Sequence, residues 1–378
     1  MPEFKKCIRD FAVKYVWKEC NISLDEIICS SGCVSLLHQL AFLLFEKGDA
    51  IIIPTPYYPA FVHDFKNIGG VQILDSSDIT ETALSEAYFR GLASNTSVKA
   101  LLLCNPCNPT GRVYTTAELE ICYSFCQCNN MHLIIDEVYA LSCFEADTFT
   151  SFATWLSART KRNYNGENVG SECEDVNKLR CGFSLGTDMV HILYSLSKDM
   201  GGSGFRVGVL YSNNTKLLQA CGGMNDVSMI SNIAQQALIP VLSDDFWVNA
   251  YLSENRSRLR ACYNAITHGL VALGVEVLPA GSGIFAFINL RKLFLKDLST
   301  DEKCLDRNNA SGFYGQEIEL ENRLRMKLLF FTPGRACHHA EPGWFRMCYA
   351  WTSLSAVHEA IRRITVLFQE NELRLRAA

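Results

Sequence analysis

Short apolar runs alternate with stretches typical of helices along the first half of the chain. Four runs are bounded by turn residues, which indicates buried strands at residues 50–53, 99–104, 132–135 and 191–194. Helix-like stretches lie before or between them, at residues 36–45, 82–93 and 115–129. Strands that alternate with helices predict parallel strands joined by right-handed crossovers. We therefore expect an α/β fold built on a mostly parallel sheet.

The same pattern predicts the remaining elements. Further strands are expected at residues 26–29, 71–74 and 206–211, and further helices at 2–20, 214–222 and 228–242. A long helix should begin at Ser243, its N-cap, and end near Leu273. Beyond it we expect strands at 281–291, 323–331 and 344–349 and a closing helix at 355–373. This organisation predicts a large domain over residues 1–245, with a long surface excursion at 141–188, and a linking helix and smaller α+β domain over 246–378.

Polar residues follow three of the predicted strands at the point where each strand ends. They are found at residues 30–35, 105–112 and 136–139. The carboxyl ends of parallel strands meet at one edge of a sheet, where ligands bind in open α/β folds. At residues 30–35 the turn also leads into a helix, whose first backbone N–H groups and dipole can hold a phosphate. We therefore expect a ligand site at this edge, although each turn by itself is compatible with a purely structural role.

A glycine-rich loop that contains Lys198 joins two other predicted strands. Ser195 and Ser197 precede the lysine closely, and Arg206 follows it. A lysine amine can bond to an aldehyde, while hydroxyl and guanidinium groups donate hydrogen bonds to an anion. Near the end of the chain, Arg346 can fork onto a carboxylate with two parallel hydrogen bonds. The residues around Lys198 indicate a covalent lysine beside a phosphate, whereas Arg346 taken by itself is equally compatible with a strand arginine that faces solvent.

The motifs together resemble the class I and II aminotransferases that use pyridoxal phosphate, and within that group the 1-aminocyclopropane-1-carboxylate (ACC) synthases and their animal homologues. The resemblance rests on Asn-Pro-Thr-Gly at 108–111, Asp-Glu-Val-Tyr at 136–139, Ser-Leu-Ser-Lys at 195–198 and Glu-Pro-Gly-Trp-Phe-Arg at 341–346. It implies a fold type I enzyme with pyridoxal 5'-phosphate as cofactor. It also implies a homodimer, because the family's sites lie at a dimer interface.

The resemblance implies a role for each motif residue. Lys198 would hold the cofactor covalently and remove the substrate Cα proton, and Asp136 would keep the pyridine nitrogen protonated. Asn108 and Tyr139 would hydrogen-bond the ring hydroxyl, Tyr58 would stack on the ring, and Arg346 would bind the substrate carboxylate. The phosphate would be held by Gly32, Cys33, Val34, Ser195, Ser197 and Arg206, with Val34 standing where the family has a threonine.

Three reaction outcomes fit these residues equally well. An ACC synthase converts S-adenosylmethionine into ACC and methylthioadenosine, an aminotransferase releases a keto acid, and a β-lyase eliminates a group from a sulfur amino acid. Two readings outside this chemistry also stay open, namely an acyl enzyme with Ser195 as nucleophile and a relative that binds cofactor without turnover. Met1-Pro-Glu-Phe4 resembles a family segment that lies well inside full-length members, so we expect an N-terminally truncated chain.

Composition excludes several other classes of protein. The 378 residues carry a formal charge of −5 and no block of Lys or Arg, which argues against a nucleic-acid partner. No apolar run reaches membrane-spanning length, and the first residues lack the shape of a signal peptide, so we expect a cytoplasmic protein without a membrane partner. The 17 cysteines should be reduced thiols, and their spacing does not predict a metal site.

Overall fold

The computed structural model describes residues 2–144, 149–164, 187–294 and 313–377. The chain separates into two compact units. The first unit comprises Met1–Pro54, Ala60–Pro106 and Val113–Ser253, and the second comprises Thr55–Pro59, Cys107–Arg112 and Glu254–Ala378. The division into functional domains at residues 245 and 246 stays a prediction.

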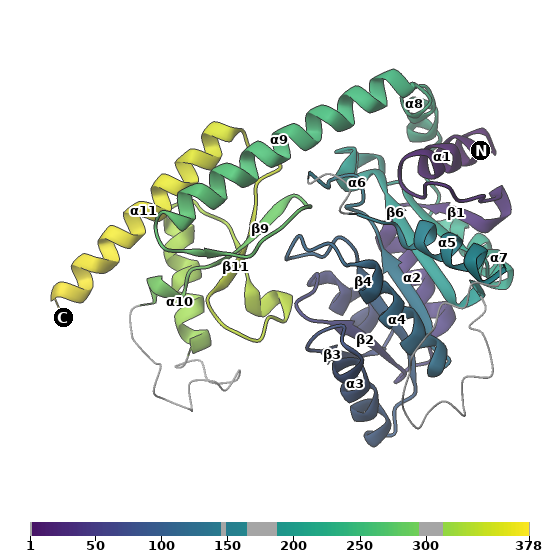
Figure 1. Cartoon of the computed structure of the whole chain (residues 1–378), viewed down its shortest axis with the longest axis horizontal. Coiled ribbons are helices and arrows are strands. Elements are labelled where there is room, and N and C mark those ends of the chain that lie inside the picture. The colour runs from purple at the N-terminus through teal and green to yellow at the C-terminus, as the bar shows by residue number, and fades with distance from the viewer. Residues whose placement is uncertain (1, 145–148, 165–186, 295–312, 378) are drawn as a thin grey trace. The chain divides into compact units, whose positions relative to one another are not determined.

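A seven-stranded sheet forms the centre of the first unit, with its strands drawn from purple to teal in Figure 1. The strand order is β1-β7-β6-β5-β4-β2-β3. The sheet is parallel from β3 to β6, while β7 runs antiparallel to both β6 and β1. The strands are β1 (Ile27–Ser30), β2 (Ala50–Pro54), β3 (Gln72–Ser76), β4 (Val98–Cys104), β5 (His132–Asp136), β6 (Val190–Ser195) and β7 (Gly208–Ser212). The predicted α/β class with a mostly parallel sheet is confirmed.

Amphipathic helices cover this sheet. Among the contacts that they make, α2 packs on β6 and β7, α3 on β2 and β3, and α4 on β4 and β5. The helices are α1 (Pro2–Tyr15), α2 (Cys33–Leu44), α3 (Glu81–Ala93), α4 (Thr116–Cys128), α5 (Phe152–Tyr164), α6 (Leu196–Asp199), α7 (Thr215–Met224), α8 (Asn232–Leu242) and the start of α9 (Asp245–Val271). Short turns are η1 (Leu24–Glu26), η2 (Val62–Ile68), η3 (Thr187–Met189), η4 (Ser203–Phe205) and η5 (Asn225–Val227).

An antiparallel sheet with the order β10-β11-β9-β8 forms the centre of the second unit. Its strands are β8 (Glu276–Val277), β9 (Phe285–Asn289), β10 (Thr332–Pro333) and β11 (Trp344–Cys348). The unit also contains the rest of α9, η6 (Arg291–Leu293), α10 (Phe313–Met326), η8 (Gly334–Cys337) and α11 (Leu354–Ala377). Phe287 and Phe345, one from each central strand, are almost fully buried and show where the core lies.

Two local predictions are wrong. Of the strand expected at 323–331, residues 323–326 are instead the end of α10 and residues 327–331 are turn and coil. Leu320 and Leu324 are buried four residues apart on one helical face, while Leu328, beyond the helix, is exposed. The cap of α9 is Asp244, whose carboxylate accepts a hydrogen bond from Trp247 N at 3.0 Å. Ser243 follows the last residue of α8 instead.

The described parts of residues 141–188 differ from the surface excursion that we expected. Ser142 and Phe152 are fully buried, and α5 continues from Phe152 along the first unit. Residues 145–148 and 165–186 lie outside the described part of the chain.

Candidate active site

Four strands of the first unit end at one edge of the sheet, which we call the carboxyl edge. Cys104 is in register with Asp136, the last residue of β5, and Ser195, the last residue of β6, is in register with Gly208. Gly208 is also opposite Ser30, which ends β1. The end of β5 is also bonded to the turn that follows β4, because Asn105 N donates a hydrogen bond to Asp136 O at 2.9 Å. The predicted convergence of these strand ends is therefore found.

The turn at the start of α2 forms a narrow cradle with the start of β7. Gly32 precedes the helix with φ +84°, and a Cβ there would overlap the Arg206 guanidinium. A Cβ on Gly208 would lie 2.6 Å from Cys33 N. The first backbone N–H groups of α2 and the Arg206 guanidinium are thus close together, as an anion-binding site requires. Val34 is 39% exposed in the first turn of α2, and its side chain adds no hydrogen-bond donor to the backbone N–H groups.

The lysine lies in α6, a single helical turn directly after β6. Ser195 is its N-cap, with Oγ accepting a hydrogen bond from Ser197 N at 3.0 Å and donating to Val207 O at 2.7 Å. The Lys198 side chain is exposed, whereas Ser195 is only 2% exposed. The hydroxyl of Ser195 is therefore committed to the turn, which argues against an acyl enzyme that uses it as nucleophile.

Asp136 is a buried carboxylate at the end of β5. Its Oδ1 accepts a hydrogen bond from Val138 N at 3.4 Å. Burial raises the pKa of the Asp136 carboxyl to about 7, although the Val138 hydrogen bond and the charge of Lys198 each lower it. A raised pKa indicates a carboxylate that would be stabilised by a further cation. Tyr139, three residues later, is 3% exposed.

The second unit contains the other three predicted site residues, Tyr58, Asn108 and Arg346. Arg346 Nη1 donates to Asn108 Oδ1 at 2.8 Å, and Nη2 donates to Thr332 Oγ1 at 3.0 Å. Arg346 Nε is buried and has no hydrogen-bond partner among the described residues. Tyr58 is half-buried, next to Tyr57, which is 2% exposed. The structure thus brings Asn108 and Arg346 together within this unit.

Sequence reasoning missed two buried acids that directly follow site residues. Glu137 follows Asp136, and Asp199 follows Lys198; both side chains are fully buried. Each accepts two short hydrogen bonds from another turn, which lies earlier in the chain for Asp199 and later for Glu137. Their place beside Asp136 and Lys198 was visible in the sequence, but their partners were not.

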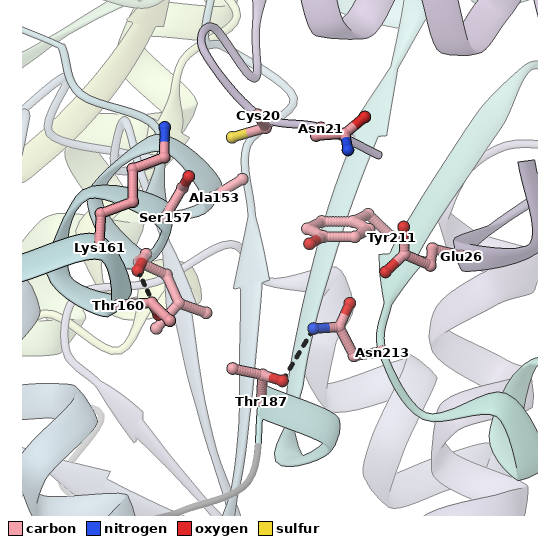
Figure 2. Close-up of a pocket in the computed structure, with 11 residues that line it drawn as sticks. Cys20, Asn21, Glu26, Ala153, Ser157, Thr160, Lys161, Thr187, Tyr211 and Asn213 are labelled. Atoms are coloured by element: carbon pink, nitrogen blue, oxygen red, sulfur yellow. Dashed lines mark hydrogen bonds between the residues drawn. The ribbon is translucent and has the colours of Figure 1, made fainter. Parts of the chain in front are cut away.

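A cavity of about 600 Å³ lies at the opposite edge of the same sheet (Figure 2). Thr187, Tyr211 and Asn213 line it where β6 begins and β7 ends, and Asn213 Nδ2 donates to Thr187 Oγ1 at 2.8 Å. Lys161 of α5 also lines the cavity. None of the predicted site residues is among its lining residues, so the carboxyl edge remains the candidate active site.

The described ranges of the chain contain no group of three or more His, Cys, Asp or Glu side chains placed to hold a metal ion. They contain no helix whose length and apolar character would suffice to cross a membrane.

Comparison with known proteins gives three consistent results. The family model described as Aminotransferase class I and II matches residues 1–364. ACC synthase 4 of Oryza sativa subsp. japonica is 34% identical over 373 residues, which cover 97% of this chain and 71% of that protein. ACC synthase 9 of Arabidopsis thaliana is 32% identical and is matched over 99% of this chain and 74% of its own length.

Solved structures with the same fold are aminotransferases. The aspartate aminotransferase of Thermus thermophilus with maleate has a TM-score of 0.74 at 18% identity, covering 97% of this chain and 82% of that one. The aromatic aminotransferase of Pyrococcus horikoshii OT3 also has a TM-score of 0.74, at 19% identity, and the match covers 99% of this chain and 87% of that one. At these identities the likeness establishes the fold alone, which is fold type I.

Proposed function

The chain belongs to the class I and II aminotransferase family, and from this premise we propose that it acts as an ACC synthase on S-adenosylmethionine. It is an enzyme of the pyridoxal phosphate-dependent kind, as the family and its ACC synthase relatives are. One observation carries the finer proposal: identity of 34% to a plant ACC synthase extends over 97% of this chain. The expected products are ACC and methylthioadenosine.

The residues of the first unit fit pyridoxal phosphate. The cradle between Gly32 and Arg206 offers an anion site that a side chain at either glycine, Gly32 or Gly208, would fill. Asp136, buried and with its pKa raised to about 7, is suited to a cationic ring nitrogen. Lys198 is exposed and therefore accessible to an aldehyde. We propose that Gly32, Cys33, Val34, Ser195, Ser197 and Arg206 hold the phosphate.

When bound, pyridoxal phosphate supplies an electron-withdrawing ring that stabilises negative charge at the substrate Cα. Asp136 keeps the ring nitrogen protonated through its negative charge. Lys198 holds the cofactor and then moves the proton at the substrate Cα as general base. Asn108, Tyr58 and Tyr139 orient the ring in this proposal.

Arg346 is the proposed binding group for the substrate carboxylate. Its guanidinium is already oriented by Asn108 and Thr332, and its Nε has no hydrogen-bond partner among the described residues. A guanidinium held in this way offers a donor to a carboxylate without a large loss of side-chain entropy. The same recognition would serve any α-amino acid, so it does not separate a synthase from an aminotransferase or a β-lyase.

Product analysis separates these reactions. The chain is loaded with pyridoxal phosphate and incubated with S-adenosylmethionine, with aspartate plus 2-oxoglutarate, and with cystathionine, and products are identified by mass spectrometry. ACC together with methylthioadenosine supports the proposal. A new amino acid from 2-oxoglutarate indicates an aminotransferase, and pyruvate with a released thiol indicates a β-lyase. A lysine-dependent visible absorbance band without products indicates a catalytically impaired relative.

A homodimer is the proposed assembly. Five apolar side chains are exposed between η5 and the start of α9, namely Val227, Met229, Ile233, Phe246 and Trp247. Exposed apolar residues that gather in one region often mark a protein–protein interface. Within this segment, Ser228 O accepts a hydrogen bond from Ser31 N at 2.9 Å, next to the phosphate cradle. Light scattering should give the mass of a dimer for the wild type and a lower mass for Ile233→Glu. A monomeric wild type would contradict the proposal. A cytoplasmic location also stays a prediction.

A further inference from the structure

Asp199 is a fully buried carboxylate directly after Lys198. Its Oδ2 accepts a hydrogen bond from Leu141 N at 2.7 Å, and its Oδ1 accepts one from Ser142 Oγ at 2.6 Å. A buried carboxylate is costly unless hydrogen bonds replace its water, and both oxygens receive such a bond here. Asp199 is therefore firmly attached to the turn at residues 141 and 142.

That turn is the continuation of β5. Asp136 ends the strand, Tyr139 follows it, and Ser142 N donates to Tyr139 O at 3.0 Å. Because Asp199 binds Leu141 and Ser142, it joins the Lys198 turn to the turn that contains Tyr139. The two turns come from the neighbouring strands β5 and β6, whose ladder ends at the pair Asp136 and Leu193 and does not extend to the turns.

Apart from Asp199, the bonds that the described residues make from the Lys198 turn to another element lie at its start, where Ser195 Oγ and Leu196 N both donate to Val207 O, at 2.7 and 3.3 Å. α6 is only four residues long, the lysine side chain is exposed, and Gly201 and Gly202 follow it. A one-turn helix has too few internal hydrogen bonds to be rigid by itself. The buried face of the turn consists of Leu196 and Asp199. Tyr194 of β6 is also buried, and its pKa is raised first by burial and then by the negative charge of Asp199.

We propose that Asp199 is a positioning residue that sets where the Lys198 amine lies relative to Asp136 and Tyr139. It acts through the carboxylate bonds to Leu141 and Ser142 and does not touch the cofactor. The proposal requires only the cofactor that the family uses, so it holds whichever amino acid is the substrate. Its chemical consequence is the rate at which Lys198 bonds to the cofactor aldehyde, with the aldehyde oxygen leaving as water.

The chain contains a matched control in Glu137. This second fully buried acid accepts hydrogen bonds from Ser151 Oγ at 2.7 Å and from Phe152 N at 2.6 Å. It therefore anchors the start of α5 and not the Lys198 turn. Ser142 and Ser151 are both buried and both donate to a buried carboxylate, so their alanine variants remove the same kind of bond at two places.

The test compares Ser142→Ala with Ser151→Ala in the full chain. Cofactor-free protein is mixed with pyridoxal phosphate, the bond to Lys198 is fixed with borohydride at set times, and the modified Lys198 peptide is counted by mass spectrometry. We expect Ser142→Ala to slow the formation of this bond about 10-fold, because a misplacement of about 1 Å can cost about 100-fold in rate and this variant removes only one of the two bonds to Asp199. Ser151→Ala should keep the wild-type rate, while both variants lower the melting temperature by similar amounts.

A second pair, Asp199→Asn and Glu137→Gln, removes the charge and keeps the shape of each acid. Asp199→Asn should slow the bond to Lys198 more than Ser142→Ala does, by about 100-fold, whereas Glu137→Gln should not. Hydrogen exchange at the Leu141 amide, measured without cofactor, should increase only in the Ser142 and Asp199 variants. Equal rates for Ser142→Ala and Ser151→Ala, whether fast or slow, would overturn the proposal. Product analysis plays no part in this test, so the proposed ACC synthase reaction can fail independently.

Discussion

The two edges of the seven-stranded sheet differ in the buried polar groups that they contain: the one has neutral side chains that bond to one another, and the other has a buried carboxyl group. At the edge where β5 and β6 begin, His132 Nδ1 and His191 Nε2 are 2.9 Å apart, and His191 Nδ1 is 2.9 Å from Ser212 Oγ. Burial lowers the pKa of both imidazoles, that of His132 to about 4, so both histidines are uncharged at neutral pH. At the carboxyl edge, Asp136 is buried with its pKa raised to about 7.

This difference separates structural polarity from functional polarity. The histidine and serine side chains satisfy one another, so these three side chains need no ligand to be stable. At the carboxyl edge, a bound cation would stabilise the Asp136 carboxylate, and a bound anion would accept hydrogen bonds in the Gly32 cradle. Substitutions at the carboxyl edge should therefore change chemistry, and those at the opposite edge should change stability.

The largest expected difference in activity is between variants of two lysines, one at each edge. Lys198→Ala should abolish the visible absorbance band of the bound cofactor and lower turnover by about 10³-fold or more, because it removes both the attachment and the general base. Lys161→Ala, at the cavity of the opposite edge, should leave the band and turnover unchanged. Absorbance and steady-state rates on both variants check this, and a normal band in Lys198→Ala would exclude the assignment.

A large effect on activity is also expected from Asp136→Asn. The neutral amide cannot stabilise a protonated ring nitrogen, so turnover should fall by about 10²- to 10³-fold while Lys198 still bonds to the cofactor. Steady-state rates and the borohydride-fixed Lys198 peptide measure the two effects separately. Turnover within a factor of about two of wild type would contradict the role of Asp136.

The same substitution should raise stability in the cofactor-free protein. The pKa of Asp136 is about 7 in the fold, above its usual value, so the folded state binds more protons than the unfolded state between about pH 4 and 7. Wild-type stability should then fall as pH rises through this window, and Asp136→Asn should not share the fall. We expect the variant to be more stable by a few kcal/mol near pH 8 and about equal near pH 4, since one pKa unit is about 1.4 kcal/mol. Urea unfolding at both pH values tests this sign.

The carboxyl edge was predictable because its signals are local. Apolar runs that end in polar turns, as at Asp136 and Ser195, reveal both the strand and the side at which it ends. The strand expected at 323–331 failed because the apolar run after α10 hid the helical spacing of Leu320 and Leu324.

Long-range partners could not be predicted from the pattern. The residues that bind Asp199 lie 58 and 57 positions earlier, and Asn108 is 238 positions from Arg346. Nothing in the local sequence distinguishes a buried acid that anchors a turn from a solvated one. The pairs are set by strand order and packing, which become visible only in the fold.

An intermediate effect on stability is expected from His191→Ala. The variant leaves a cavity and removes the partner of both His132 and Ser212, which should cost about 3 kcal/mol at neutral pH. The pKa of His191 lies below its usual value, so its contribution is lost as pH falls below about 6.5. The difference from wild type should therefore shrink near pH 5 in urea unfolding, with cofactor affinity unchanged. A loss of cofactor affinity at full stability would break the distinction between the edges.

The smallest effect expected lies within the carboxyl edge, at Val34. This residue is 39% exposed in the first turn of α2, where the family has a threonine. Val34→Thr adds a hydroxyl beside backbone donors that are already present, so the gain should be limited to one hydrogen bond, about 1 kcal/mol or roughly fivefold in cofactor affinity. Val34→Ala shortens the side chain without adding a donor and should leave the affinity unchanged. Titration with pyridoxal phosphate in the Lys198→Ala background measures the non-covalent part alone. If Val34→Thr and Val34→Ala bind equally, the phosphate does not lie at this turn, and the cradle between Gly32 and Arg206 has another role.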